Sequence, residues 1–340
     1  MKIAIVGATG AVGREMIQEL EDSSVGHENV EVQLLASPRS EGQVLTFRDK
    51  KLKVEAFSAE KARGSDFVLM SAGGEFSKKH SESLAEQGAV VIDNSSAWRM
   101  NENTPLITPE VNGSVLKGIQ KGIIANPNCS TIQMVVSLKP LMDLAGLSTV
   151  IVSTYQSVSG SGQKGIAELS GQLQAKMRFE ELKPSIYQQP IAFNILSHIG
   201  SFEEGEPCEE ELKMIQETKK ILNCQDLDVM ATTARVPVYH CHSESISVQL
   251  GKEVSLKDVQ DAFKAMKGLN YTEGLDPSEL PSPLHCTGRQ DVMVSRPRLL
   301  WGKERSRWLQ YWNVADNLKK GAATNAVQIL ELILEQRKKV

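Results

Sequence analysis

The sequence predicts an α/β protein of two domains, the first built on a parallel sheet and the second of α+β type. Three observations lead to this prediction. Residues 3–125 alternate apolar strand-like runs with helical segments, glycines directly follow the first of these runs, and residues 149–157 begin a part of the chain without that alternation. At 340 residues, the chain is long enough to bury two hydrophobic cores.

Composition excludes several classes of protein. Hydrophobic residues make up 41% of the chain, charged residues 24%, and the formal net charge is −4, as in ordinary soluble globular proteins. This negative net charge gives no indication that the protein binds nucleic acid or an anionic membrane. No apolar run approaches the roughly 18 residues of a membrane span, and the N-terminus lacks a signal-peptide pattern. The five scattered cysteines show neither a disulfide framework nor metal-ligand spacing, so we expect a cytoplasmic protein without a metal.

The first strand and the loop after it indicate a nucleotide site. The continuous apolar run at residues 3–6 is typical of a strand covered on both faces. Glycines follow at positions 7, 10 and 13, before a helical segment that reaches Leu20. Such glycines let the backbone approach a pyrophosphate, which binds at the helix N-terminus. An ordinary glycine-rich turn is the alternative, but the place right after an N-terminal strand favours a Rossmann-like dinucleotide site.

The end of the second strand indicates which dinucleotide binds. This strand is predicted at residues 32–36 and is followed by Ser37, Pro38, Arg39 and Ser40. An NAD site would place an acidic residue here for the ribose 2′-hydroxyl. Because Arg39 lies between two hydroxyl groups and suits a 2′-phosphate, we predict a preference for NADP. Glu41 counts against this interpretation, and a solvated loop arginine is the alternative.

The rest of the first domain continues the strand–helix alternation. Small polar residues follow the apolar strands, as expected where ligands bind at the carboxyl ends of a doubly wound sheet. Arg99, in the loop after one of these strands, is either exposed or an anion ligand. The remaining strands are predicted at residues 54–57, 67–71, 89–93 and 122–125, with a helix at 77–87.

Cys129 lies at a loop-to-helix junction. The strand at residues 122–125 leads into Asn-Pro-Asn-Cys-Ser-Thr, and apolar residues at helical spacing follow over 132–144. A thiol at a helix start meets the partial positive charge there, which favours the thiolate. Backbone N–H groups at the same place can hold an oxyanion. The alternative is that Cys129 is a small buried hydrophobic residue.

The second domain is predicted to mix strands and helices, with a glycine-rich turn after the strand at 149–157. Residues 180–207 are irregular, and a loop of that length is usually functional or a contact surface. A capping box at Ser255 and Asp258 predicts one helix start. We expect the last helix, 322–335, to pack on the first domain, which gives a nucleotide-binding domain of residues 1–128 and about 318–340 and a catalytic domain of 129–317. The other predicted elements are strands at 229–238, 243–250, 292–300 and 308–314 and helices at 166–177 and 209–222.

A cysteine beside a dinucleotide fold suggests an aldehyde dehydrogenase that works through a thioester. Such a reaction needs an acid or base, and His240 and His242 form the only histidine cluster of the sequence. Glu244 lies two residues after His242, so on a strand both side chains face one way. A structural histidine is an alternative; metal binding by residues 240–242 is disfavoured because no second ligand group has matching spacing.

Six motifs make the resemblance specific, and they occur in order over nearly the whole chain: GATGAVG, NPNCST, YQSVSGSG, EELK, RVPVYHCHSE and ADNLKKGAATNA. The sequence resembles the aspartate-β-semialdehyde dehydrogenases. This resemblance implies reduction of aspartyl phosphate by NADPH to aspartate semialdehyde and phosphate, on the route to lysine (through diaminopimelate), methionine and threonine. It also implies a homodimer.

The resemblance also implies a role for each matching residue. Cys129 would be the acyl-thioester nucleophile and His242 the acid/base. Gln156 would orient the substrate, Arg235 would bind its carboxylate, and Glu210 would help to fix the site. Arg99 and Lys213 would bind phosphate. The cofactor would be lined by Gly7, Thr9, Gly10, Ala11, Val12, Gly13, Ser37, Arg39, Ser40, Ser159, Gly160 and Asn317.

Two features qualify this picture. The residue before the histidine is often Gly or Ala in the family and is Cys241 here, which puts a second thiol near the site. Arg235 and His242 are separated by an odd number of residues, so on one regular strand they would face opposite ways, and Pro237 or a turn must break the strand.

Two other functions remain open from the sequence. An enzyme similar to N-acetyl-glutamyl-phosphate reductase would share the thioester chemistry, although the RVPV and EELK segments favour an aspartate-β-semialdehyde dehydrogenase. A non-enzymatic NADP-binding redox sensor would have a similar glycine turn. The sensor gives no reason for Gln156, Arg235 and His242 to accompany the cysteine.

Overall fold

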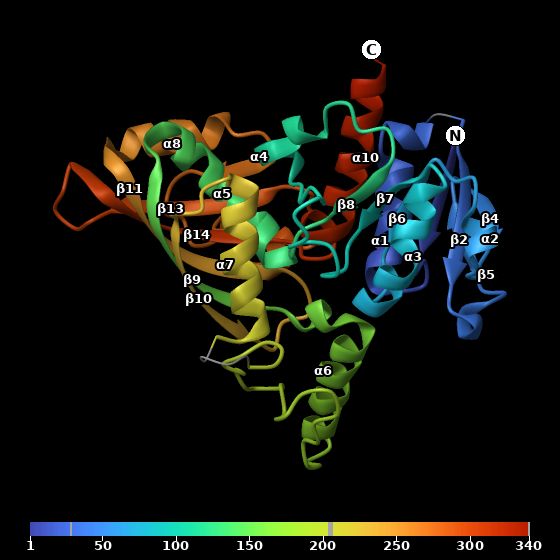
Figure 1. Cartoon of the computed structure of the whole chain (residues 1–340). Coiled ribbons are helices and arrows are strands. Elements are labelled where there is room, and N and C mark those ends of the chain that lie inside the picture. The colour runs from blue at the N-terminus through green and yellow to red at the C-terminus, as the bar shows by residue number, and fades with distance from the viewer. Residues whose placement is uncertain (28, 203–206, 339–340) are drawn as a thin grey trace. The chain divides into compact units, whose positions relative to one another are not determined.

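A computed structural model describes residues 1–27, 29–202 and 207–338. The chain divides into two compact units (Figure 1). Unit 1 comprises Met1–Asn128 and Ala322–Val340, and unit 2 comprises Cys129–Gly321. Each unit has its own six-stranded sheet.

The sheet of unit 1 is parallel throughout and has the order β5-β2-β1-β6-β7-β8. The order reverses between β1 and β6, and this reversal is where ligands bind in doubly wound sheets. The parallel sheet confirms the predicted fold class of this region. Its strands are β1 (Lys2–Val6), β2 (Glu31–Ala36), β5 (Glu55–Ala56), β6 (Phe67–Met70), β7 (Val90–Asp93) and β8 (Gly122–Ala125).

Helices cover both faces of this sheet, which is why its strands are apolar at successive positions. Helices α1 (Ala11–Asp22) and α10 (Thr324–Arg337) lie side by side (Figure 1) and pack with Ile3 and Ile5 in one core. Helix α3 (Gly74–Glu86) contributes to a second core with Ala4 and Val6. The shorter elements are η1 (Val25–His27), η2 (Pro38–Ser40), α2 (Ala59–Ala62), α4 (Pro109–Asn112) and η3 (Gly113–Leu116).

An antiparallel hairpin of β3 (Val44–Phe47) and β4 (Lys50–Lys53) was not predicted from the sequence. Its strands are mostly exposed and rich in lysine, and only Phe47 is buried, so no apolar alternation marks them. The turn needs left-handed backbone at Arg48 and Asp49, which neither residue type signals strongly.

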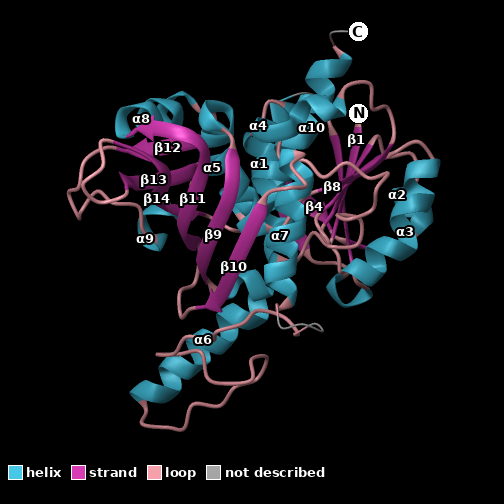
Figure 2. Cartoon of the chain, turned by 60° about the vertical axis from the view of Figure 1, so that its left-hand side comes forward, coloured by secondary structure: helices cyan, strands magenta, loops and turns pink. Residues whose placement is uncertain are grey.

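The sheet of unit 2 is mixed and has the order β10-β9-β11-β14-β13-β12 (Figure 2). The pairs β9–β10 and β12–β13 are parallel, and the others are antiparallel. Its strands are β9 (Leu147–Gln156), β10 (Asp228–Arg235), β11 (His242–Ser255), β12 (Leu269–Thr272), β13 (Val292–Leu299) and β14 (Arg305–Ala315).

One face of this sheet is covered by three helices, α5 (Cys129–Ala145), α7 (Glu209–Leu222) and α8 (Leu256–Ala265). Helix α5 is central, and most of its residues are buried, including the polar Gln133 and Ser137. The capping box at Ser255 and Asp258 is confirmed at the start of α8. The remaining elements are η4 (Val158–Ser161), α6 (Gly162–Met177), α9 (Pro283–Cys286) and η5 (Lys319–Ala323), the last of which is a π-helix.

Two of the predicted boundaries that differ from the structure concern the site. The strand predicted at 229–238 ends already at Arg235, and the next strand begins at His242. Pro237 has no N–H for a ladder, and Cys241 adopts left-handed backbone, so the chain turns between them. The helix predicted from residue 132 begins at Cys129 itself.

Candidate active site

Three predicted residues form one row across neighbouring strands of unit 2. Gln156 at the end of β9 pairs with Arg235 at the end of β10 and with His242 at the start of β11. Residues in register on adjacent strands project to the same face of a sheet. The odd sequence separation of Arg235 and His242 is therefore no obstacle, because the turn at 236–241 puts them on different strands.

Cys129 is the first residue of α5 and is partly exposed. Gly321 packs directly against it, because a Cβ atom at Gly321 would lie 2.9 Å from the Cys129 Cβ. The neighbouring Ser130 donates a hydrogen bond from Oγ to Glu210 Oε1 at 3.4 Å. Glu210 Oε1 also accepts a bond of 3.0 Å from Gln156 Nε2, so the carboxylate links the start of α5 to the row on the sheet.

Arg235 is held within this row. Its Nη1 donates to the carbonyl oxygen of Ser157 at 2.7 Å, and the residue is buried. A Cβ atom at Gly160 would lie 2.8 Å from Arg235 Nη1 and 3.4 Å from His242 Nε2. Glycine at position 160 therefore leaves open the space in front of both functional groups.

The contacts of His242 define its tautomer. The backbone N–H of Ser157 donates to Nδ1 at 3.1 Å, so Nδ1 is an acceptor and the proton of the neutral ring lies on Nε2. Ser157 Oγ lies 3.2 Å from the same nitrogen and donates to Asn317 Oδ1 at 3.0 Å. Nε2 is buried and has no hydrogen-bond partner among the described residues. This donor is thus available to a reacting group.

His242 is held neutral by its surroundings. Burial, together with the positive charge of Arg235, lowers the pKa of His242 from 6.5 to about 3, although the backbone of Cys241 acts in the opposite direction. The ring therefore stays uncharged across the range in which enzymes work. A neutral ring with its proton on Nε2 acts as an electrophile or hydrogen-bond donor rather than as a charged acid.

This shift predicts a dependence of stability on pH. His242 becomes protonated below about pH 6.5 in the unfolded chain but only below about pH 3 in the folded chain. The free energy of unfolding therefore decreases as the pH is lowered from about 6.5 to about 3. Between pH 7 and pH 5 the wild-type protein should lose about 2 kcal/mol more unfolding free energy than His242→Gln. Denaturant titrations of both proteins at the two pH values measure this difference, and equal losses would contradict the assignment.

Asn317 joins the segments that surround His242. Its Oδ1 accepts hydrogen bonds from Ser157 Oγ, Ser159 Oγ and the backbone N–H of Cys241, each at 3.0 Å. Asn317 and Ser159 are both buried. These two predicted cofactor residues therefore hold each other and the histidine loop, and their contact with a cofactor stays a prediction.

The two predicted phosphate ligands belong to different units, so their meeting stays a prediction. In unit 2, Lys213 Nζ forms an ion pair with Glu209 Oε1 at 2.7 Å, one turn earlier on α7. In unit 1, Arg99 is buried and donates to the carbonyl oxygens of Asn126 at 3.0 Å and Asn94 at 2.8 Å. Arg99 thereby ties together the loops that follow β7 and β8.

The glycine loop of unit 1 fits a dinucleotide. A Cβ atom at Gly7, where φ is +84°, would lie 2.1 Å from the Ser71 carbonyl oxygen, and one at Gly13 would lie 2.2 Å from that of Gly7. Gly10 is the N-cap of α1, whose first N–H groups receive no capping side chain. The loop thus offers the close backbone and open helix start that a pyrophosphate needs.

The residues predicted to bind the 2′-phosphate lie beside this loop. Thr9 Oγ1 and Ser40 Oγ are 3.1 Å apart, which joins the glycine loop to η2. Arg39 and Ser37 in the same segment are exposed, as is Glu41. A cation and hydroxyl groups therefore follow the end of β2, and their contact with the ribose phosphate of a dinucleotide stays a prediction.

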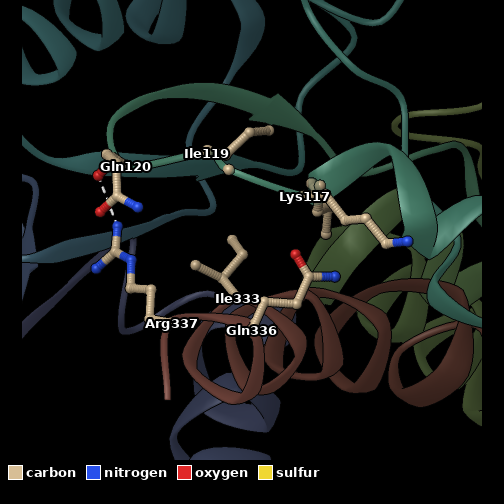
Figure 3. A pocket seen from close by; sticks show the side chains of 8 residues that line it. Lys117, Ile119, Gln120, Ile333, Gln336 and Arg337 are labelled. Carbon is tan, nitrogen blue, oxygen red and sulfur yellow. Dashed lines mark hydrogen bonds between the residues drawn. The ribbon is translucent and has the colours of Figure 1, made fainter. Parts of the chain in front are cut away.

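A pocket of unit 1 contains no predicted site residue. Residues 116–120 and the end of α10 line it, and Arg337 Nη2 donates to the carbonyl oxygen of Gln120 (Figure 3). Residues 116–120 directly precede β8, so the pocket lies at the amino ends of the parallel strands. The glycine loop lies at the opposite, carboxyl ends.

The second thiol near the site is not suited to nucleophilic attack. Cys241 is fully buried in an apolar cluster with Cys286 and Met293. Burial raises the pKa of Cys241 to about 12. Within the described residues, no group of three His, Cys, Asp or Glu side chains is arranged to hold a metal ion.

Sequence reasoning did not single out Ser157 or Gly321. Ser157 acts on His242 through its backbone N–H, and Gly321 acts by having no side chain, so neither has a residue-type signal. Both lie in motifs that carry the family resemblance, YQSVSGSG and ADNLKKGAATNA. Only the folded arrangement assigns them to the histidine and to the cysteine.

Two family models together match most of the chain. Residues 2–119 match the family model "Semialdehyde dehydrogenase, NAD binding domain", and residues 138–320 match "Semialdehyde dehydrogenase, dimerisation domain". The chain is 47% identical to aspartate-semialdehyde dehydrogenase of Aquifex aeolicus, with 98% of each chain covered. It is 43% identical to that of Bacillus subtilis, over 97% of this chain and 96% of the relative.

A solved structure is similar over the same extent. The crystal structure of aspartate semialdehyde dehydrogenase II from Vibrio cholerae, complexed with ASA, has a TM-score of 0.92 and 39% identity, with 98% of each chain covered. In the part of the chain that the structure describes, every helix is too short or too polar to cross a membrane.

Proposed function

The chain belongs to the aspartate-semialdehyde dehydrogenase family, and on that premise we propose that it reduces L-aspartyl-4-phosphate with NADPH to L-aspartate-4-semialdehyde and phosphate. The reaction runs through a thioester on Cys129 and serves the synthesis of lysine, methionine and threonine. The observation that carries the proposal is the row of Arg235, Gln156 and His242, linked through Glu210 to the start of α5.

Cys129 is the nucleophile of this proposal. The first turn of α5 has backbone N–H groups without helical partners, and their partial positive charge stabilises a thiolate. The thiolate attacks the acyl carbon of aspartyl phosphate, the carbon–oxygen bond to phosphate breaks, and a thioester forms. The proton consumed in the overall reaction ends on the released phosphate.

His242 stabilises the oxyanions of the reaction. Its neutral ring, with the proton on Nε2, supports a hydrogen bond to the carbonyl oxygen in both tetrahedral states. When bound, NADPH supplies the hydride that reduces the thioester carbonyl. Collapse of the resulting alkoxide releases the aldehyde and restores the Cys129 thiolate. No full proton transfer from the ring is needed, which refines the acid/base role that the resemblance implies.

Arg235, Gln156 and Glu210 bind the substrate. A guanidinium anchored through one nitrogen presents a planar fork that matches the α-carboxylate. The Glu210 carboxylate offers a negative charge to the α-ammonium group and orients the amide of Gln156. For phosphate we propose Arg99 and Lys213, where Lys213 exchanges its partner Glu209 for the phosphate oxygens.

The cofactor site of the proposal is the glycine loop of unit 1. Gly7, Gly10 and Gly13 admit the pyrophosphate, and Thr9, Ser37, Arg39 and Ser40 surround the 2′-phosphate. Ala11 and Val12 are the first two residues of α1, whose N-terminus would face the negative charge of the pyrophosphate. Ser159, Gly160 and Asn317 complete the proposed set.

Arg39→Ala is expected to reduce the preference for NADP. A charge-assisted contact with the 2′-phosphate contributes about 1.5–3 kcal/mol, so the KM for NADP should rise roughly ten- to a hundredfold. The KM for NAD should stay nearly unchanged, because NAD has no phosphate there. Steady-state kinetics with each cofactor measure this, and equal losses with both would assign Arg39 a structural role.

We also propose a homodimer formed through unit 2. The match to the dimerisation-domain model supports this proposal. Exposed apolar side chains on the face of the sheet opposite α5 support it as well. On that face Met230 is 63% exposed and its register partner Ile151 is 39% exposed, which is unusual for neighbouring apolar residues on a sheet. The rings of Tyr155 and Trp312 are tilted against each other by 41°, with their centroids 5.7 Å apart.

The proposed function is tested by the reverse reaction. Purified protein is given aspartate semialdehyde and NADP, with and without phosphate, and NADPH formation is followed by absorbance. We expect formation that depends strictly on phosphate. Formation without phosphate would indicate release of the acyl group to water, and N-acetyl-glutamate semialdehyde as the better substrate would indicate the related reductase.

A further inference from the structure

Glu244 is a fully buried carboxyl group that the proposed reaction does not use. It lies two residues after His242 on β11, so both side chains project to the same face of the sheet, toward α5. In register beside it on β14 is Asn313, which is also fully buried. A carboxyl group in such a place is costly unless it is hydrogen-bonded or neutral.

Glu244 belongs to a polar cluster with Asn313 and Gln133. Asn313 Nδ2 donates to Glu244 Oε2 at 2.9 Å and to the backbone carbonyl of Gln133 at 3.2 Å. Gln133 Nε2 donates to the backbone carbonyl of His242 at 3.3 Å. Gln133 lies one turn after Cys129 on α5, so the cluster spans from the nucleophile's helix to the histidine's strand.

Three oxygen atoms of the cluster lack a donor. Glu244 Oε1, Gln133 Oε1 and Asn313 Oδ1 are all buried without a hydrogen-bond partner among the described residues. An ionised carboxylate would add to this excess of acceptors, whereas a protonated carboxyl supplies a donor. The unpartnered oxygens therefore favour a protonated Glu244, whose O–H group supplies one donor to the cluster.

The electrostatic surroundings of Glu244 also favour its protonated form. Burial raises the pKa of Glu244 well above its ordinary value of 4.5, against the opposing effect of Gln133 and Asn313, and the charge of Glu210 on α7 raises it further. Tyr311 on β14 also interacts with Glu244, and burial raises the pKa of this phenol, which keeps it protonated. Glu244 therefore acts as a neutral hydrogen-bonding group.

We propose that Glu244 is a positioning residue that, through Gln133 and Asn313, holds the first turns of α5 against the start of β11 and so fixes the separation of Cys129 and His242. It touches no reacting atom. The amide of Gln133 makes the direct link to His242. Glu244 fixes the orientation of that amide through the side-chain interaction between Glu244 and Gln133. The inference rests on the roles proposed above for Cys129 and His242.

The test compares two replacements of Glu244 in the full-length protein. Glu244→Gln keeps the shape and a donor, and we expect its kcat to stay within about threefold of wild type. Glu244→Leu fills the space but removes the hydrogen bonds, and we expect a kcat roughly 10- to 100-fold lower with KM values nearly unchanged, because the reacting groups are misplaced. Rescue by glutamine together with a loss confined to kcat separates positioning from general loss of stability.

A second variant and a control complete the design. Gln133→Leu should show the same kcat loss, and the double variant Glu244→Leu/Gln133→Leu should be no worse than either single one, because one link is broken in all three. If Glu244→Leu does not fold, Gln133→Leu carries the test alone. Ser295→Ala removes another fully buried polar group, on β13, where its register partner is Trp312 rather than Asn313, and should leave kcat unchanged.

Three results would overturn the inference. Equal losses in Glu244→Gln and Glu244→Leu would mean that the carboxylate charge is needed. A lowered melting temperature without a kcat loss, in folded Glu244→Leu or Gln133→Leu, would mean a purely structural role. Additive losses in the double variant would mean that the two residues act separately. Failure of the wild-type assay would instead contradict the proposed function, so the two failures are distinguishable.

Discussion

Replacing Cys129 with serine is expected to lower kcat for phosphate-dependent oxidation of aspartate semialdehyde at least about 1000-fold, which corresponds to about 4 kcal/mol of barrier. A serine hydroxyl at the same helix start remains protonated and is a poor nucleophile without a strong base beside it. The neutral His242 is not such a base, because Nδ1 is occupied by the Ser157 N–H and Nε2 carries the ring proton. The fold and NADP affinity should persist, as fluorescence titration with NADP would show.

The control for this variant is Cys241→Ser. Cys241 lies beside His242 in the chain, but its thiol is buried in an apolar cluster and its pKa is raised to about 12. Its removal should therefore change kcat little. Mass spectrometry of wild-type protein incubated with semialdehyde and NADP, but without phosphate, should detect the acyl group on the peptide of Cys129. An acyl group on Cys241, or a larger loss in Cys241→Ser, would assign the nucleophile to the wrong cysteine.

The sequence was sufficient for the parts of the protein that local patterns determine. The apolar runs of unit 1, such as residues 3–6, predict strands because both faces of that sheet are covered. The capping box at Ser255 and Asp258 predicts a helix start because both hydrogen bonds of the motif lie within four residues. In these cases the physical cause is contained in neighbouring residues.

The arrangement of the site depends on pairings between distant parts of the chain. The register that brings Gln156 between Arg235 and His242 is set by three strands and the turn at 236–241, and periodicity within one strand cannot reveal it. The three bonds to Asn317 Oδ1 are likewise invisible in residue type alone. Sequence motifs indicated most of these residues but did not indicate which side chains or strands they contact.

The second large effect is expected at His242, where two replacements distinguish a hydrogen-bond donor from a proton-transferring acid. His242→Ala removes the donor from the position of the developing oxyanion, which should lower kcat about 100- to 1000-fold. In His242→Gln the side-chain amide can present an N–H near the position of Nε2, although it exchanges no proton. If the neutral ring acts as a donor, the glutamine variant should retain about tenfold more activity than the alanine variant.

The pH profile of the wild-type enzyme gives an independent check on the same assignment. Because burial and Arg235 lower the pKa of His242 to about 3, kcat/KM should show no ionisation of this ring between pH 5 and pH 8. An inflection near pH 6.5 that disappears in His242→Gln would mean that the ring ionises in the free enzyme within this range. A glutamine variant no more active than the alanine variant would mean that the reaction needs the exchangeable ring proton that both variants lack. In either case the electrophilic role would be replaced by acid–base catalysis, with the Ser157 N–H released from Nδ1 as the ring changes its protonation.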